Sequence, residues 1–327
     1  MNGIGAIIRA AEARRDAIRR VATSEAGAHL AGALRKRWLP LPSPNLGALR
    51  DAVAVDGTGH AVGLATGAHL IVALAVAIGP HPVGRIDLAE VEALPARFDD
   101  AAASSARDLV MRALEADVAL QALRRSIDEG SVDRTTIWSD GSLYADLAHM
   151  AGGPSVVRWG GGAERAGALI RATRDLHLGA ERAGAWLVGL AKTQRANVLG
   201  PALTTSPDHE GDTTIGPWAS PGDAGRPRDG EILAAMPDGW SWPLLLDARQ
   251  FPAVEAEAAS ILADCPAIVT TYIRPHPADL PLRLDVPASA LGLPDRVGTA
   301  PRHGEQEPGA WVADPDAMRP FVAEVMG

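Results

Sequence analysis

The stretch TTIWSDGS, residues 135–142, joins a β-branched and apolar run to an Asp-Gly-Ser ending. A second copy lies upstream, where AVAVDGT, residues 52–58, runs from apolar residues into Asp-Gly-Thr. Short apolar runs of this kind are typical of buried strands. A single Asp-Gly is most often a hairpin turn, but two copies at the ends of two predicted strands favour one chemical site built from two places.

The rest of the chain predicts strands and helices in alternation, which is the pattern of an α/β fold. A strand over 52–55 ends at Asp56, and the apolar stretch after Gly59 predicts a second strand that pairs with it as a hairpin. Apolar residues at helical spacing predict helices over Ser104–Arg125 and Ala163–Leu176. We also expect strands over 135–138, 185–190, 242–247 and 267–273, and loops over 160–162 and 200–230.

The N-terminal segment predicts an amphipathic basic helical arm over 1–44. Isoleucines recur at helical spacing among arginines, and the Pro-rich run 40–44 ends the segment. The basic side chains form either a solvated helix face or a surface that meets phosphate or a partner. Residues 45–327 then make one domain, with a loop-rich insertion at about 200–230.

Composition limits the classes of protein to which this chain can belong. Its 327 residues, 47% hydrophobic with a net charge of -9, suffice for a packed core and argue against tight nonspecific binding of nucleic acid by the whole surface. The single cysteine, Cys265, excludes an internal disulfide and a multi-cysteine zinc site. No stretch has the pattern of a signal peptide or a membrane span, and we expect a cytoplasmic protein.

Three charged residues are predicted at strand ends, where α/β sheets gather their functional groups. They are Asp56, Asp140 and Lys192, the last directly after the strand over 185–190. Two carboxylates at neighbouring strand ends suit Mg²⁺ or Mn²⁺, which prefer oxygen ligands. The helix over 104–125 offers a third acid, Glu115 or alternatively Asp117. Lys192 would balance phosphate charge or orient the nucleophile, and the hydroxyl of Ser142 or Thr58 would hold a carboxylate or a turn amide.

The order of five motifs resembles the NurA family of DNA-repair nucleases. The motifs are VAVDGTG, RALEADVALQAL, IWSDGSL, VGLAKT and TYIRP…PLRLDVP, and they span about residues 50–287. The resemblance implies an RNase H-like mixed sheet flanked by helices, and a 5′–3′ exonuclease and single-strand endonuclease that needs Mn²⁺ or Mg²⁺. It also implies a homodimer that acts on DNA in double-strand break end resection with a hexameric HerA-type ATPase.

The resemblance also assigns roles to individual residues. Asp56, Glu115 and Asp140 match the metal-binding and catalytic acids, and Lys192 matches the catalytic lysine after the next strand. Tyr272 matches the late strand region, where we expect it to bind substrate together with Lys192. The pair Arg283 and Asp285 also matches that region, and its structural alternative is an ion pair near the sheet edge beside a buried Tyr272 hydroxyl.

The C-terminal run ADPDAMRPFVAEVMG departs from the family, which usually ends with a Gly-Tyr-Pro-like segment and a helix carrying His or Asp. His276 and His303 occur nearby but not in that context. This departure leaves a second hypothesis open, a non-catalytic adaptor that keeps the fold and docks a partner through its basic arm. A third hypothesis is an actin-like nucleotide-binding phosphotransferase, because Asp56-Gly57-Thr58-Gly59 also fits a phosphate-clamping hairpin.

Overall fold

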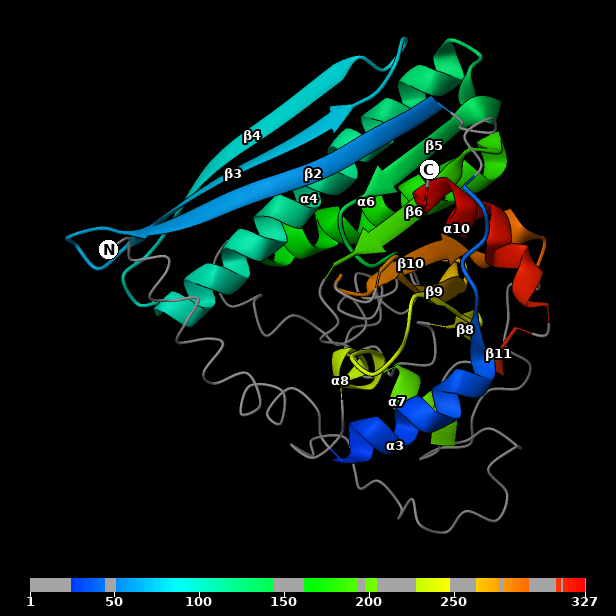
Figure 1. Cartoon of the computed structure of the whole chain (residues 1–327). Helices are drawn as coiled ribbons and strands as arrows, with labels where there is room; N and C mark the ends of the chain where they lie inside the picture. Colours follow the sequence, from blue (N-terminus) through cyan, green and yellow to red (C-terminus); the bar gives the residue numbers. More distant parts are fainter. Residues whose placement is uncertain are drawn as a thin grey trace, which may run out of the picture.

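A large mixed sheet forms the centre of the protein in a computed structural model (Figure 1). The structure describes residues 25–44, 51–143, 162–192, 198–204, 228–247, 263–276, 279–293, 310–312 and 314–326. The strands run in the order β1-β7-β9-β10-β6-β5-β2-β3-β4, and β8 joins β9 to β11. Their bounds are β1 Trp38–Leu39, β2 Asp51–Gly63, β3 His69–Ile78, β4 Arg85–Leu94, β5 Thr135–Ser139, β6 Trp186–Ala191, β7 Gly239–Ser241, β8 Leu244–Leu246, β9 Ile268–Arg274, β10 Leu282–Pro287 and β11 Ala310–Trp311.

Helices lie on both faces of this sheet. Their bounds are α3 Glu25–Leu34, α4 Asp100–Asp128, α6 Gly162–Ala183, α7 Leu199–Thr204, α8 Asp229–Leu233 and α10 Arg319–Val325, with 3-10 turns η1 Arg35–Arg37, η2 Val132–Arg134, η5 Ala288–Leu291 and η6 Pro315–Met318. The predicted α/β class, a mixed sheet flanked by helices, is confirmed.

Three parallel strands bring the two Asp-Gly motifs together. β2 pairs in parallel with β5, and β5 pairs in parallel with β6, whereas β2, β3 and β4 are antiparallel neighbours. Parallel neighbours need a crossover, and α4 and α6 supply it before β5 and β6. The C-terminal ends of β5 and β6 therefore lie at the same edge, beside the middle of β2.

Alternate side chains of the parallel strands enter two separate cores. Ile137 and Leu187 are buried with residues of α4 and α6. Trp138 and Trp186 project from the other face, where the Trp186 ring lies 4.4 Å from the ring of Phe321 on α10. The period-two pattern of β5 and β6 thus buries both faces of the sheet, which is why these strands read as nearly continuous apolar runs.

The helix α4 lies along β2, β3 and β4 over its whole length (Figure 1). Asp99 caps its N-terminus, because the Asp99 carboxylate accepts a hydrogen bond of 2.8 Å from the Ala102 amide. Small residues dominate the contact, with Ala73, Ala75 and Ala77 of β3 buried against it. The predicted helix over Ser104–Arg125 is confirmed and extends by several residues at each end.

Four other predictions need correction. β2 does not end at Asp56 but continues to Gly63, and the predicted hairpin turns at residues 64–68 instead. The strand expected over 242–247 is shorter than predicted, because β8 begins only after Trp242 and Pro243 and ends at Leu246; β7, which ends at Ser241, precedes it and was not predicted. The start of the predicted 200–230 loop is helical, within α7, and α8 begins at its end; residues 205–227 lie outside the described part. β4 was not predicted at all.

The N-terminal arm is described only from residue 25 onward, so the helix expected over residues 4–21 lies outside the described part. Within the described part, α3 packs in one core with α7 and α8, and β1 pairs with β7. The division at residue 44 stays a prediction. Cys265 is a buried free thiol, and none of the described helices has the length and apolarity of a bilayer span.

Candidate active site

Asp56 and Asp140 occupy equivalent positions on neighbouring strands. Val55 is paired with Ser139 across the parallel ladder, and each aspartate follows its paired residue directly. The Asp140 amide donates a hydrogen bond of 3.1 Å to the Val55 carbonyl, which fixes the first residue after β5 against β2. Asp140 thus ends its strand as predicted, whereas Asp56 lies within a continuing strand, its carboxylate accepting a hydrogen bond of 2.8 Å from the Gly57 amide.

Lys192 directly follows β6 and reaches the same place. Its ammonium donates a hydrogen bond of 2.8 Å to the Asp140 carboxylate. That hydrogen bond and the charge of Asp140 raise the pKa of Lys192, and the charge of Asp56 raises it further by a smaller amount. Both acids therefore act on one lysine, in a cluster open to solvent.

Glu115 approaches β2 from α4, across the space that a side chain at Gly57 would occupy. A Cβ built on Gly57 would lie 2.5 Å from Glu115 Oε1 and 2.8 Å from its Cγ. This close approach explains the glycine of the first motif, where β2 makes no turn. Glu115 therefore lies beside Gly57, the residue that follows Asp56 in β2.

Asp117, the alternative third acid, lies elsewhere. Partial burial raises the pKa of Asp117, the charge of Arg124 lowers it, and Glu90 of β4 raises it further. These neighbours place Asp117 toward β4 and Arg165 of α6. Glu115 is thus the acid that α4 places beside Gly57.

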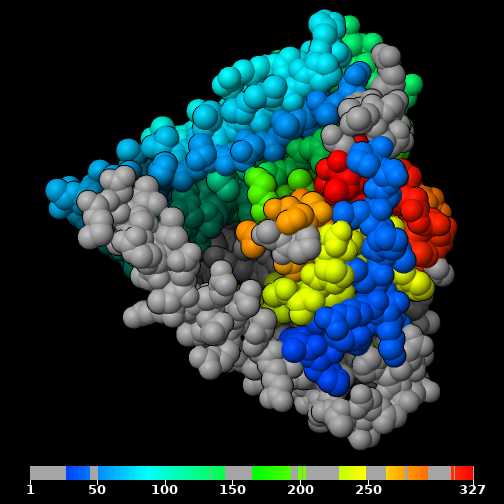
Figure 2. Space-filling model, viewed as in Figure 1, coloured from blue at the N-terminus to red at the C-terminus, as the bar shows by residue number. Residues whose placement is uncertain are grey.

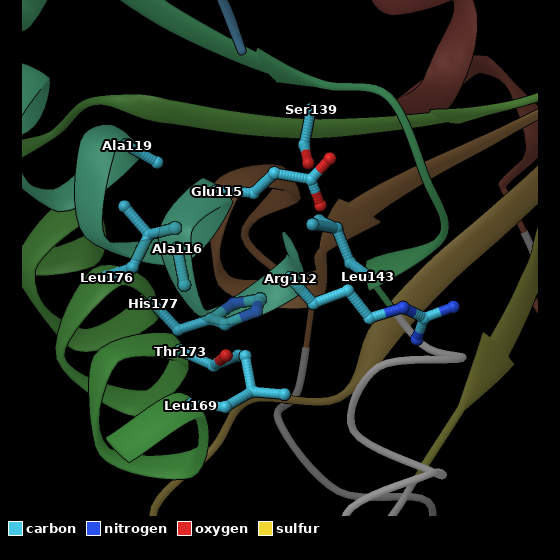
Figure 3. Close-up of a pocket in the computed structure, with 10 residues that line it drawn as sticks. All are labelled: Arg112, Glu115, Ala116, Ala119, Ser139, Leu143, Leu169, Thr173, Leu176 and His177. Carbon is cyan, nitrogen blue, oxygen red and sulfur yellow. The ribbon is translucent and has the colours of Figure 1, made fainter. Parts of the chain in front are cut away.

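A residue that the sequence did not reveal, His177, lines a small pocket beside Glu115 (Figure 3). The pocket has a volume of about 30 Å³ and lies between α4, which carries Glu115 and Arg112, and α6, which carries His177 and Thr173. His177 is 2% exposed, and burial lowers its pKa to about 4. Its Nδ1 atom has no hydrogen-bond partner in the described structure. A single histidine in an amphipathic helix carries no sequence signal, so only the fold reveals this position.

Comparison of the fold with solved structures gives a similarity over the whole chain. The crystal structure of the NurA nuclease from Sulfolobus solfataricus superposes with a TM-score of 0.50 at 14% identity, covering 100% of this chain and 86% of that one. The chain has the NurA fold. A crystal structure of NurA gives a TM-score of 0.48, and one of NurA bound to dAMP and manganese gives 0.44, each at 12% identity over 88% of this chain and 87% of the other. No family model and no curated protein sequence matches the chain.

Tyr272 contradicts its expected role within this NurA fold. Its side chain is fully buried, and its hydroxyl donates a hydrogen bond to the Asp229 carboxylate. Asp229 in turn accepts hydrogen bonds of 2.9 Å from the amides of Val198 and Leu199 at the start of α7. A tyrosine in this position holds α7 and α8 to β9 and cannot contact substrate, so the structural alternative is correct.

The Arg283–Asp285 ion pair is present, but not near the sheet edge. Arg283 Nε lies 2.8 Å from Asp285 Oδ1, and β10 runs between β9 and β6 in the interior of the sheet. Burial has the largest single effect and lowers the pKa of Arg283, but the charge and hydrogen bond of Asp285, together with the charges of Tyr272 and Asp229, outweigh it and raise the pKa overall.

The chemistry of the donor set fits a hard divalent cation, because all three acids offer only carboxylate oxygens. Asp140 holds an ammonium in the structure, which shows that the cluster attracts positive charge. Within the described residues, however, no three His, Cys, Asp or Glu side chains are close enough together to hold a metal ion as they stand. The role of Asp56, Glu115 and Asp140 as metal ligands therefore stays a prediction.

Proposed function

We propose that this chain is a metal-dependent DNA nuclease. The observation that carries the proposal is the cluster of Asp56, Asp140 and Lys192 at β2, β5 and β6, within a NurA fold. Glu115 approaches the same stretch of β2 at Gly57. The three acids would hold Mn²⁺ or Mg²⁺. Such an ion, once bound, activates a water molecule and stabilises the charge that develops on a cleaved phosphodiester.

Lys192 has a separate role in this proposal. Its side chain is 65% exposed, and its ammonium lies on Asp140, from which it can turn toward an incoming phosphate without breaking any buried contact. It would neutralise the phosphate and keep the DNA strand beside the acids. An exposed pair of this kind is worth about 0–1 kcal/mol, so substrate can displace it at little cost.

The test is cleavage of linear duplex and single-stranded DNA with Mn²⁺, with Mg²⁺ and with a chelator. The variants are Asp56→Asn, Glu115→Gln and Asp140→Asn, and the control is Asp87→Asn, an acid of an exposed ion pair on β4. We expect cleavage by the wild type and the control, and a loss of at least a hundredfold in the other three. Equal cleavage by the wild type, the control and the three variants would refute the site.

The same experiment resolves the finer activity. Strands labelled at the 5′ or the 3′ end separate 5′–3′ exonuclease from single-strand endonuclease products, both of which we propose. We further propose that the protein acts in DNA end resection in the cytoplasm, as a homodimer with a hexameric HerA-type ATPase. Co-purification with such an ATPase, and stimulation of cleavage by ATP, would test the partnership.

A non-catalytic adaptor is the second candidate, because the acids are not close enough as they stand to hold a metal. Calorimetry with Mn²⁺ alone separates the two candidates, since an adaptor need not bind the ion. The third hypothesis, an actin-like phosphotransferase, needs a phosphate-clamping hairpin turn at Asp56-Gly57-Thr58. These residues instead pair with β3 inside a continuous strand, so the structure gives no support to that hypothesis.

A further inference from the structure

We propose that Asp285 is a positioning residue for Asp140, and that it acts through the serine of the Asp-Gly-Ser motif. The Ser142 hydroxyl donates a hydrogen bond of 2.6 Å to Asp285 Oδ2, across 143 residues of sequence. The proposal rests on the proposed function in one respect only, that Asp140 is a metal ligand. The proposal explains why the third residue of the Asp-Gly-Ser motif is a serine.

The Asp285 carboxylate is itself held in one orientation. Asp285 is fully buried, and its Oδ1 atom accepts hydrogen bonds of 2.8 Å from Arg283 Nε and 2.7 Å from Thr270 Oγ1. Arg283 also donates a hydrogen bond of 3.1 Å to Thr270 Oγ1, so that Arg283, Thr270 and Asp285 are each bonded to the other two. With Oδ1 occupied in this way, Oδ2 is directed at Ser142. The short Ser142 contact is of the charge-assisted kind, roughly twice as strong as a neutral hydrogen bond.

Besides the contact of Lys192 with Asp140, the backbone of the turn that carries Asp140 makes two hydrogen bonds to neighbouring strands. The Asp140 amide donates to Val55, and the Gly141 amide donates 3.2 Å to the Leu190 carbonyl of β6. Gly189 of β6 lets the turn pack closely, because a Cβ there would lie 2.8 Å from the Gly141 carbonyl oxygen. Ser142 adds a side-chain hydrogen bond to Asp285 on β10. It fixes the residue two positions after Asp140, where the chain leaves the sheet.

Burying the ion pair is costly, and stability alone is a weak reason for it. A buried pair often contributes nothing over apolar residues of the same volume. Here the pair holds Asp285 Oδ2 as a hydrogen-bond acceptor 2.6 Å from the Ser142 hydroxyl. Groups behind metal ligands typically change metal affinity by 10–100-fold when removed, which is the effect expected of a positioning residue.

The test uses Ser142→Ala in the full-length chain, because removal of Asp285 would leave Arg283 buried without its counter-charge. We expect Mn²⁺ affinity, measured by calorimetry without DNA, to fall about tenfold. Amide hydrogen exchange in the segment 139–143 should accelerate about tenfold, whether or not the protein cleaves DNA. Ser142→Thr keeps the hydroxyl and should restore both values.

The matched control is Ser241→Ala, which removes a buried serine hydroxyl on β7 that is bonded to Thr271. It should leave Mn²⁺ affinity and exchange over 139–143 unchanged, even if it lowers thermal stability. Wild-type exchange over 139–143 in Ser142→Ala would overturn the positioning proposal. A wild type that neither binds Mn²⁺ nor cuts DNA would overturn the proposed function instead, and the exchange measurement would still decide whether Asp285 orders the turn.

Discussion

Gly57 is the residue whose role the structure changes most. The sequence assigns it to a turn because Asp-Gly commonly makes one, yet here it pairs with Ala75 in mid-strand. Its missing side chain is replaced by the Glu115 carboxylate, a contact between residues 58 positions apart that no local pattern can encode. The closeness of Asp140 and Lys192 was predictable, because the ends of neighbouring parallel strands meet at one edge. Asp56 joins them through the register of β2 with β5, although β2 does not end there.

Gly57→Ala should therefore impair metal binding more than folding. The added Cβ would contact the flexible end of Glu115, which can swing away, so we expect a stability loss of at most about 2 kcal/mol. Mn²⁺ affinity should fall at least tenfold, because the displaced carboxylate is a proposed ligand. Calorimetry and thermal melts measure the two effects separately.

Two comparisons check this interpretation. Gly63→Ala is the control, because a Cβ at Gly63 meets nothing within 4 Å. Combining Gly57→Ala with Glu115→Ala should cost no more affinity than Glu115→Ala alone, since both changes remove one contact. Additive losses would show that Gly57 acts independently of Glu115.

His177 predicts a pH dependence of stability. Its pKa is about 4 in the folded protein against 6.5 as the ordinary value, so the unfolded chain binds a proton first as pH falls. Stability should then decrease as pH drops from about 6.5 to about 4, by roughly 3 kcal/mol from this group, and level off below. Arg112 and Glu115 of α4 line the same pocket.

Urea melts of wild type and His177→Gln between pH 4 and pH 8 measure this effect. Glutamine does not titrate, so the fall attributable to residue 177 should vanish in the variant while the contribution of the carboxylates remains. If the two proteins lose stability in parallel, His177 is not protonated on unfolding in the way that its burial implies.

At the scale of elements, predictability follows from where the charged residues lie. α4 and β5 were predicted because their apolar positions repeat at the period of the element. β4 was missed because its inner face carries Glu90 and Glu92, and Val91 between them is exposed on the outer face. Arg165 of α6 forms ion pairs with both glutamates. A strand whose inner face is charged looks like an exposed segment until the partner from α6 is known.

The alanines of β3 predict how closely α4 can approach the sheet. Ala75 is fully buried, so Ala75→Leu would force α4 away and should lower stability by about 1–3 kcal/mol. Ala89→Leu on β4 makes the same chemical change at an exposed position and should alter stability by less than about 0.5 kcal/mol. Chemical denaturation of both variants measures the difference, and equal losses would mean that α4 does not limit the packing.

At the scale of the whole molecule, the outer face of the sheet formed by β2, β3 and β4 is unusually apolar. Six of the eight exposed large hydrophobic residues of the described part lie on these strands or in their turn, with Val91 64% exposed. They are Val62, Leu64, Val72, Leu74, Ile78 and Val91. Figure 2 shows these strands, in blue to cyan, as one elongated surface along the side of the molecule. We propose that this row of exposed apolar side chains is an interface, because exposed apolar patches commonly mark one.

A second copy of the chain is the partner that we expect on this face. One flat, apolar surface can meet itself across a two-fold axis, which is how most homodimers are built. Val72→Glu would place a charge in the middle of β3's outer row and should shift the protein from dimer to monomer in light scattering. Ile127→Glu is the control, because Ile127 is equally exposed, at 42%, but lies at the end of α4 away from that face. A dimer that survives Val72→Glu but dissociates with Ile127→Glu would place the interface at the end of α4 instead.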